Sequence, residues 1–274
     1  MSLLYEKLTY QIRKCIFEVR QEIGAGFDEE TYHQALILSF EKNNVPYISK
    51  DSRALKHRNI LIRNFMNDFT LFNKIILSLK CVPYKFLQTH YVQLFNELKL
   101  WKKGLGLIVN FGLPDLDIER YIYEEPEAQV IEQYDYIKDT ITSEEKEILI
   151  QLRKAIKNVT KIHKLGYDKG VWRKILEVEI KFLDLSCEIN KIINIKFEGT
   201  TVRQYELRHF IIENKIIVGI TALQDNVNQV DIANMQSYLR KLKLRVGIIV
   251  NFGKNELHIV GVRTPHGSKT PTEE

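Results

Sequence analysis

Leu107-Ile108-Val109-Asn110-Phe111-Gly112 decides how this chain is organised, because the stretch returns as Ile248-Ile249-Val250-Asn251-Phe252-Gly253. The same step of 141 residues carries Asn73-Lys74-Ile75-Ile76 onto Asn214-Lys215-Ile216-Ile217. Five residues between positions 11 and 19 recur at a step of 140 rather than 141, so the two copies differ by one inserted residue. A repeat of this length is a whole folding unit, unlike the solenoid periods of about 20 to 50 residues. The sequence therefore predicts two copies of one domain.

The chain length agrees with this duplication. Its 274 residues suit two domains at 1–125 and 141–263, each large enough to bury its own core. The first domain ends in an acidic connector that starts at 113, and a polar tail with two prolines occupies 264–274. A content of 45% hydrophobic and 27% charged residues is typical of a soluble globular protein.

Charge is distributed unevenly along the chain. Lys and Arg outnumber Asp and Glu by 16 to 10 over residues 1–112 and by 22 to 16 over 141–274. Residues 113–140 hold 2 basic and 9 acidic side chains, which we interpret as a solvated linker that could also mimic phosphate across a basic groove. Two mildly basic domains are compatible with a polyanionic partner, although solubility alone explains the surplus equally well.

Other classes of protein are not favoured. No apolar run approaches the roughly 20 residues needed to cross a bilayer, and the first ten residues do not resemble an export signal. We therefore expect an intracellular protein, cytoplasmic or nuclear, that is neither secreted nor membrane-bound. The cysteines Cys15, Cys81 and Cys187 are far apart and odd in number, which argues against a disulfide framework or a zinc site.

Apolar periodicity predicts one element order in both copies: helix, helix, strands, helix, strand. Spacings of three and four from Leu8 to Ile23 indicate an amphipathic helix, and a second helix is expected to start near Asp28. The other segments of the first copy are strands at 45–49, 59–65, 67–72 and 74–81, a helix at 89–102 and a buried strand at 105–111. In the second copy, a helix through 152–159 precedes strands near 190–198, 202–212 and 215–222, a helix at 229–243, and strands at 245–252 and 256–262.

A constellation of polar residues accompanies this order in the first copy. Residues 26–32 (GFDEETY) fit the pattern GxxExxY; a predicted strand then carries Asp68, the next ends in 78–80 (SLK), and Gln93 lies on the following helix. In order and spacing, the chain resembles the GxxExxY family of the PD-(D/E)xK nuclease-like superfamily. The resemblance implies an α/β fold: two tandem α/β/α sandwich domains, each a small mixed sheet flanked by helices, which together form a pseudo-dimer.

The resemblance also implies a chemistry. Family members hold Mg²⁺ between strand carboxylates, a strand Lys orients the attacking water, and a helix Glu adds a ligand. Carried onto the first copy, these catalytic roles fall to Asp68, Lys80, Glu29 and Gln93, but Ser78 stands where the second strand carboxylate belongs. Glu97 stands where the family has Tyr. It lies four residues after Gln93 on the same helix face and could replace the missing acid. The implied metal ligands are therefore Asp68, Glu29 and Glu97.

The second copy has lost this set. Its GxxExxY equivalent has Lys169 in place of Glu, and the Asp position is His209. The strand acid, Lys and Gln positions are Gly219, Thr221 and Asn234. Such a group cannot hold Mg²⁺, so we predict that the second site is catalytically dead.

Each polar residue of the first site also has a structural interpretation. Glu29 suits the first turn of a helix and Asp68 suits a turn. Lys80 could be a solvated edge lysine, and Glu97 an exposed helix residue. In the second copy, His209 is expected to be a satisfied polar residue rather than a general base.

Three hypotheses about function remain. The leading one is a degenerate nuclease-like protein that acts by binding DNA, RNA or another protein. The second is an Mg²⁺-dependent nuclease that cleaves phosphodiesters with the first domain alone. The third is a protein-interaction scaffold that never contacts nucleic acid.

Overall fold

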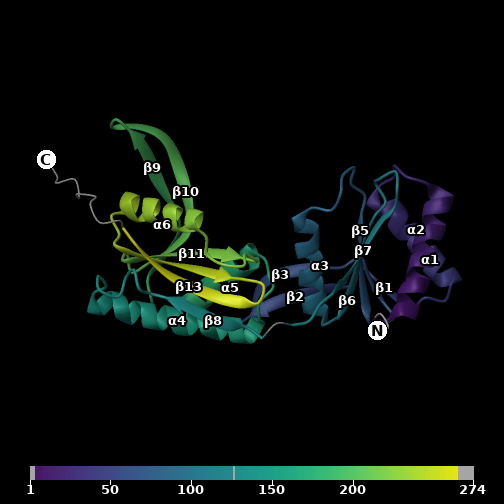
Figure 1. Ribbon diagram of the computed structural model, residues 1–274, viewed down its shortest axis with the longest axis horizontal. Helices are drawn as coiled ribbons and strands as arrows, with labels where there is room; N and C mark the ends of the chain where they lie inside the picture. Colours follow the sequence, from purple (N-terminus) through teal and green to yellow (C-terminus); the bar gives the residue numbers. More distant parts are fainter. Residues whose placement is uncertain (1–3, 126, 265–274) are drawn as a thin grey trace. The chain divides into compact units, whose positions relative to one another are not determined.

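The computed structural model describes residues 4–125 and 127–264, and the chain divides into two units, Met1–Glu125 and Pro126–Glu274. Residues 265–274, which make up all but the first residue of the predicted polar tail, lie outside the described part. None of the helices in the described ranges combines the length and the apolar character that crossing a membrane requires. Each unit contains one mixed sheet with helices packed on its faces (Figure 1).

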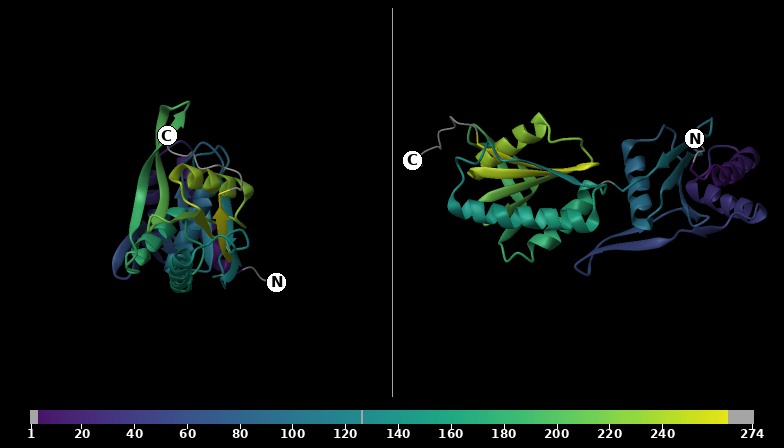
Figure 2. Two further views of the ribbon diagram at one scale, coloured as in Figure 1. Left: turned by 90° about the vertical axis from the view of Figure 1, so that its left-hand side faces the viewer. Right: turned by 60° about the horizontal axis from the view of Figure 1, so that its bottom comes forward.

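Unit 1 contains three helices and a five-stranded sheet in the order β1-β4-β5-β6-β7. The central strands β5 and β6 run parallel, and the other neighbours are antiparallel. The elements are α1 (Glu6–Ile23), α2 (Glu29–Lys42), β1 (Tyr47–Ser49), β2 (Ser52–His57), β3 (Ile60–Met66), β4 (Phe69–Leu71), β5 (Ile75–Lys80), α3 (Gln88–Trp101), β6 (Leu105–Asn110) and β7 (Asp117–Ile122). The strands β2 and β3 form a separate hairpin that extends away from the sheet (Figure 2).

The core of unit 1 explains the three layers. Alternate side chains of a strand face opposite sides of the sheet. On β5, Leu77 and Leu79 pack with residues of α1 and α2, whereas Ile76 packs with Leu94 and Leu98 of α3. The sheet is therefore covered on both faces, and this is why β5 and β6 read as continuous apolar runs in the sequence.

Unit 2 repeats the arrangement with a six-stranded sheet in the order β8-β13-β12-β11-β10-β9. Here β11 and β12 form the parallel pair. The elements are β8 (Gln129–Gln133), α4 (Ser143–His163), α5 (Lys169–Ile180), β9 (Cys187–Phe197), β10 (Thr200–Ile212), β11 (Ile216–Ala222), α6 (Gln229–Leu242), β12 (Val246–Phe252) and β13 (Glu256–Arg263). The predicted fold class, two tandem PD-(D/E)xK-like α/β domains, is confirmed.

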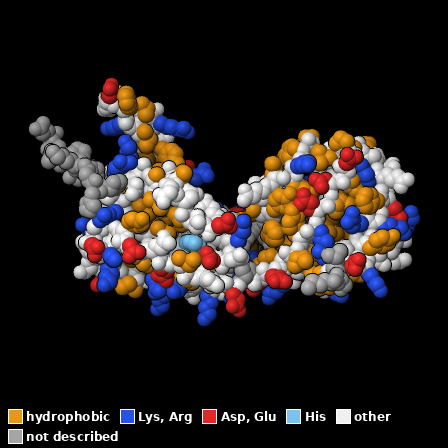
Figure 3. Space-filling view, in the orientation of Figure 1, with side chains coloured by type: hydrophobic (Ala, Val, Ile, Leu, Met, Phe, Trp, Pro, Cys, Tyr) orange, Lys and Arg blue, Asp and Glu red, His pale blue; other side chains and the backbone are white. Residues whose placement is uncertain are grey.

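The β9–β10 hairpin is the most distinctive element of unit 2. It continues beyond the sheet and rises past α6, and its end carries apolar side chains flanked by Lys and Arg (Figures 1 and 3). Ile192, Phe197 and Val202 are between 62% and 67% exposed.

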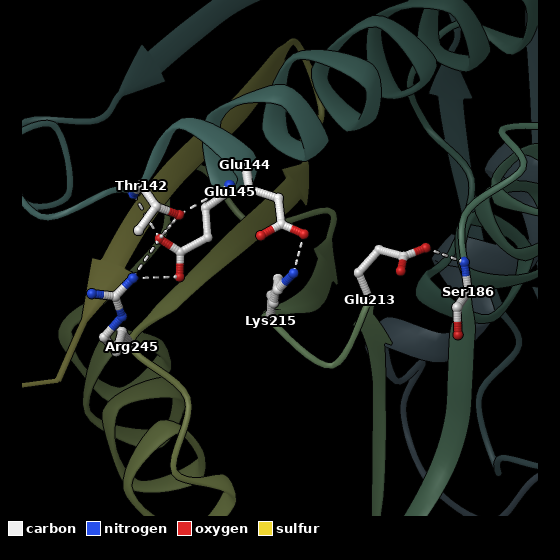
Figure 4. A network of polar contacts seen from close by, with 7 residues as sticks. All are labelled: Thr142, Glu144, Glu145, Ser186, Glu213, Lys215 and Arg245. Atoms are coloured by element: carbon white, nitrogen blue, oxygen red, sulfur yellow. Dashed lines mark hydrogen bonds and ion pairs between the residues drawn. The ribbon is translucent and has the colours of Figure 1, made fainter.

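A polar network fixes the beginning of α4 in unit 2 (Figure 4). Thr142 and Glu145 form a reciprocal capping box, in which each side chain accepts a hydrogen bond from the other's backbone N–H. Glu145 is 4% exposed, and both of its carboxylate oxygens accept hydrogen bonds from Arg245 at 3.0 and 3.1 Å. Since Arg245 immediately precedes β12, the network ties the first turn of α4 to the central sheet.

The interpretation of 113–140 as a solvated linker is wrong. Residues 117–122 form β7 at the edge of the first sheet, and residues 129–133 form β8 at the edge of the second. One acid in each strand has a partner within its own unit. Glu119 accepts a hydrogen bond from Tyr91, and Glu132 pairs with Arg153 and Lys157 on α4. Neutralisation by neighbouring side chains allows these acidic segments to join a sheet.

Candidate functional site

The first candidate site lies at the C-terminal end of β5. Because Leu77 and Leu79 pack toward α1 and α2, the alternating residues Ser78 and Lys80 face α3. Lys80 is 8% exposed, and its Nζ donates hydrogen bonds to Ser78 Oγ at 3.2 Å and to the Leu79 carbonyl oxygen at 2.5 Å. The interpretation of Lys80 as a solvated edge lysine is therefore wrong, since β5 is an interior strand and the ammonium bonds to its own strand.

Asp68 reaches the same strand end from the segment between β3 and β4. Its Oδ2 accepts a hydrogen bond from the backbone N–H of Leu79 at 2.8 Å. Asp68 directly precedes β4 rather than lying on the strand, which agrees with its interpretation as a turn residue. The structure thus brings Asp68 and Lys80 together at the end of β5, although one carboxylate oxygen of Asp68 is already occupied.

Glu97 is the buried acid of the first site. It is 1% exposed, which corrects the interpretation of Glu97 as an exposed helix residue. Gln93 Nε2 donates to Glu97 Oε1 at 2.9 Å, whereas Oε2 has no hydrogen-bond partner within the described residues. Burial is the main cause that raises the Glu97 pKa to about 8; the Asp68 and Glu29 charges add to it, while Gln93 and Lys80 oppose it. Glu97 is therefore mostly protonated at pH 7.

Glu29 is the first residue of α2, directly after the N-cap Asp28, whose side chain accepts the backbone N–H of Thr31. Its side chain reaches the surface, yet its pKa is raised, first by lost solvation and then by the negative charge of Asp68. The positive charge of Lys80 opposes this shift. Glu29, Asp68, Lys80 and Glu97 therefore influence one another electrostatically, as the members of one site do.

The first site does not fit a divalent cation in this arrangement. Hard cations such as Mg²⁺ need several charged oxygen ligands at close range. Across residues 4–125 and 127–264, no group of three or more His, Cys, Asp or Glu side chains is placed so that it could hold a metal ion. The negative charge of Asp68 thus raises the pKa of Glu29 and of Glu97, but the three acids form no coordination shell within the described residues. A protonated Glu97 is also a poor ligand for Mg²⁺.

The second candidate site is a pocket of about 600 Å³ in unit 2. All five positions of the degenerate site line it: Lys169, His209, Gly219, Thr221 and Asn234. Gly219 provides room for the imidazole, because a Cβ there would lie 2.9 Å from Met235 Cε and 3.1 Å from His209 Nε2. The repeat alignment therefore located a real cavity, and the glycine at the former acid position is what allows His209 to lie close over β11.

The charge of this pocket is opposite to that of a metal site. Lys169 is the first residue of α5, the position that Glu29 holds in α2. Burial, together with the positive charges of Lys169 and Arg173, lowers the His209 pKa to about 4, so His209 is neutral at pH 7. Its Nδ1 is buried without a hydrogen-bond partner in the described part of the chain, which corrects the expectation of a satisfied histidine.

Sequence reasoning missed four further residues that line this pocket: Arg203, Tyr205, Arg208 and Tyr238. A signal existed for Tyr238, because the step of 141 aligns it with Glu97, where the family pattern has Tyr. The others lie on β10, where a register shift between Leu207 and Phe210 disturbs the regular alternation of side chains. Such a bulge redirects side chains and cannot be located from an apolar pattern.

The comparisons with known proteins agree with the fold. A family model described as the PD-(D/E)XK nuclease superfamily matches residues 6–121 and, a second time, residues 146–263. The chain therefore belongs to the PD-(D/E)XK nuclease superfamily, and it contains two copies of the family's domain. No curated protein and no solved structure matches the chain.

Proposed function

We propose that this protein is a degenerate tandem nuclease of the GxxExxY type that binds nucleic acid without cleaving it. The observation that carries the proposal is the charge inversion of the second site. Lys169, the neutral His209 and Gly219 occupy the three positions where the family pattern has acids, and all three line the pocket. With these three acids lost, the site no longer has the ligands that the family uses to hold Mg²⁺, whereas the cations that line the pocket attract the phosphate that the metal would have contacted.

The first site supports the same proposal in a different way. Ser78 replaces the strand acid, and the substitute acid Glu97 is buried and protonated at pH 7. Lys80, which would orient the attacking water, is bonded to Ser78 and Leu79 instead. None of the three groups is arranged for metal-dependent hydrolysis.

An Mg²⁺-dependent nuclease in unit 1 is the second candidate, because one specific observation favours it. Glu97 Oε2 is buried without a partner among the described residues, and its pKa responds to both Asp68 and Lys80. To bind a cation, Glu97 would have to be deprotonated and would have to act together with Asp68 and Glu29. Any such Mg²⁺ would be held by these three acids and would supply Lewis acidity at the phosphate.

A nuclease assay separates the two candidates. Labelled single-stranded and duplex DNA and RNA are incubated with the full chain in Mg²⁺ or Mn²⁺, alongside Asp68→Ala, Lys80→Ala and the exposed-lysine control Lys85→Ala. We expect equal background cleavage from all four proteins. Metal-dependent cleavage that Asp68→Ala and Lys80→Ala abolish and Lys85→Ala retains would contradict the proposal.

Binding is tested separately by fluorescence anisotropy across a salt series. We expect the affinity for nucleic acid to fall steeply between about 50 and 200 mM salt, because phosphate contacts release counterions. Affinity that is independent of salt, or no binding at all, would favour the protein-interaction scaffold instead.

A further inference from the structure

The pocket of unit 2 combines unpaired cations with exposed aromatic rings. The side chains of Lys169, Arg203 and Arg208 line it and form no ion pair or hydrogen bond with any residue in the described ranges. Two acids line it as well, Glu206 and Asp231. Asp231 is engaged in the capping box of α6, where it accepts the backbone N–H of Asn228. The pocket therefore carries a positive balance with cations available to a ligand.

Lys169 is placed where local structure disfavours it. A cation at the first residue of a helix opposes the positive end of the helix dipole, so Lys169 destabilises α5 unless an anion lies nearby. No carboxylate in the described residues pairs with it. The N-cap Asp168 already accepts the N–H groups of Gly170 and Val171, so the Lys169 side chain is the group that remains available to a phosphate, and a bound phosphate would relieve its unfavourable placement.

Two tyrosines form the aromatic wall of the pocket. The rings of Tyr205 on β10 and Tyr238 on α6 are stacked, with centroids 6.3 Å apart and an angle of 20° between planes. The ring of Tyr238 also lies edge-on to the ring of His209, with the two centroids 4.9 Å apart. Tyr205 is 39% exposed, so the aromatic wall continues to the surface of the hairpin, near the apolar and basic side chains visible in Figure 3.

The size of the pocket limits what can enter. A cavity of about 600 Å³ has room for a small molecule or one nucleotide, but not for a double helix. A base within a duplex has both faces covered by its neighbours and cannot stack on a protein ring, whereas an unpaired base can.

We propose that this pocket binds one unpaired nucleotide of a nucleic-acid strand, with the phosphate held by Lys169 and the two arginines and the base stacked on Tyr205. The proposal rests on the proposed function and specifies the ligand of the second site. The protein thereby distinguishes single strands from duplexes. The side-chain cations take over the phosphate contact of the lost metal, so the strand is held and not cut.

The test uses the full chain and labelled oligo-dT, oligo-U and a duplex of equal length. We expect at least one of the single strands to bind about tenfold more tightly than the duplex. Lys169→Glu and Tyr205→Ala should each weaken single-strand binding about tenfold, and Tyr205→Phe should preserve it because the ring remains. Matched controls are Lys174→Glu, an exposed lysine on the same helix that does not line the pocket, and Tyr136→Ala, a tyrosine 62% exposed.

In the Lys169→Glu variant, thermal stability and binding affinity should change in opposite directions. An acid at the first residue of α5 suits the helix dipole, so this variant should melt at a higher temperature while it binds more weakly. Salt-dependent binding with no preference for single strands, or with equal affinity in Lys169→Glu, Tyr205→Ala and both controls, would overturn the pocket proposal and leave the proposed function standing. Absence of binding to all three probes would remove the proposed function and the pocket proposal together.

Discussion

Glu97 shows how one buried side chain controls the chemistry of a site. With a pKa of about 8 when folded and an ordinary value near 4.5 when unfolded, it favours folding most below pH 4.5. This contribution is lost as the pH rises through about 8. Glu97→Gln keeps the shape without the charge, and we expect it to raise the free energy of unfolding at pH 7 by about 3 kcal/mol, with no gain near pH 4. Urea denaturation at both pH values measures this.

Glu22→Gln is the control for this prediction, because Glu22 is exposed on α1. It should change the free energy of unfolding by less than about 0.5 kcal/mol at either pH. Added Mg²⁺ extends the test to the metal hypothesis. If Mg²⁺ stabilises the parent protein and not Glu97→Gln, then Glu97 is a ligand after all and the binding-only interpretation of unit 1 is wrong.

His209 has the opposite pH dependence. Its pKa of about 4 when folded lies below the ordinary value of 6.5, so its contribution to stability is complete above 6.5 and is lost as the pH falls through about 4. Between pH 7 and pH 5 we expect unit 2 to lose on the order of 2 kcal/mol. His209→Gln should remove most of this loss, measured by urea denaturation followed with Trp172 fluorescence. An unchanged pH dependence in the variant would contradict the assignment to His209.

Between secondary-structure elements, the contact of α4 with the start of β12 should make the free energy of unfolding sensitive to the single substitution Arg245→Ala. Burial raises the Glu145 pKa, but hydrogen bonds from Thr142 and Arg245 outweigh it and hold the pKa below its ordinary value. Arg245→Ala leaves a carboxylate that is 4% exposed without its charged partner. We expect a loss of about 2 kcal/mol in the free energy of unfolding, measured by thermal or urea denaturation.

Arg240→Ala is the matched control, since Arg240 is exposed on α6 and donates only to Ser237 Oγ. A loss of less than about 0.5 kcal/mol is expected there. Equal losses in the two variants would show that the network in Figure 4 contributes nothing specific to the position of α4.

Local patterns predicted most helices and interior strands, because burial on one helix face or on both sheet faces leaves a period in the sequence. Of the missed strands, β2 and β7 pair with strands that are close in the sequence, whereas β8 depends on a distant partner. The edge strand β8 pairs with β13 more than 120 residues later, and no local pattern encodes that pairing. The turn between β4 and β5 has positive φ angles at Phe72 and Asn73, and the Lys74 N–H donates to the Leu71 carbonyl oxygen. Positive φ at both central residues is the type I′ geometry that a hairpin twist favours.

At the scale of the whole molecule, the repeat predicted which positions correspond but not which site is open. Unit 1 retains acids at its site, but Lys80 and Glu97 are buried there. Unit 2 has lost the corresponding acids, and its site is a pocket of about 600 Å³. Openness depends on packing between distant elements: Leu94 and Leu98 pack with Trp101 and Phe86 on the α3 side in unit 1, and the small Gly219 faces α6 in unit 2. Tertiary packing of this kind is not readable from spacing along the chain.

The two units should therefore respond to acid in opposite directions. From pH 7 to pH 5, folded Glu97 binds more proton than unfolded Glu97, so acidification favours folded unit 1 by about 2 kcal/mol. Over the same range unfolded His209 binds more proton than folded His209, so acidification disfavours folded unit 2 by about the same amount. The chain has two tryptophans, Trp101 in unit 1 and Trp172 in unit 2, so Trp172→Phe and Trp101→Phe variants report on each unit separately. Urea midpoints followed by tryptophan fluorescence should rise for Trp101 and fall for Trp172 on acidification. If both midpoints move in the same direction, burial does not shift the pKa values of Glu97 and His209 in the opposite directions expected here.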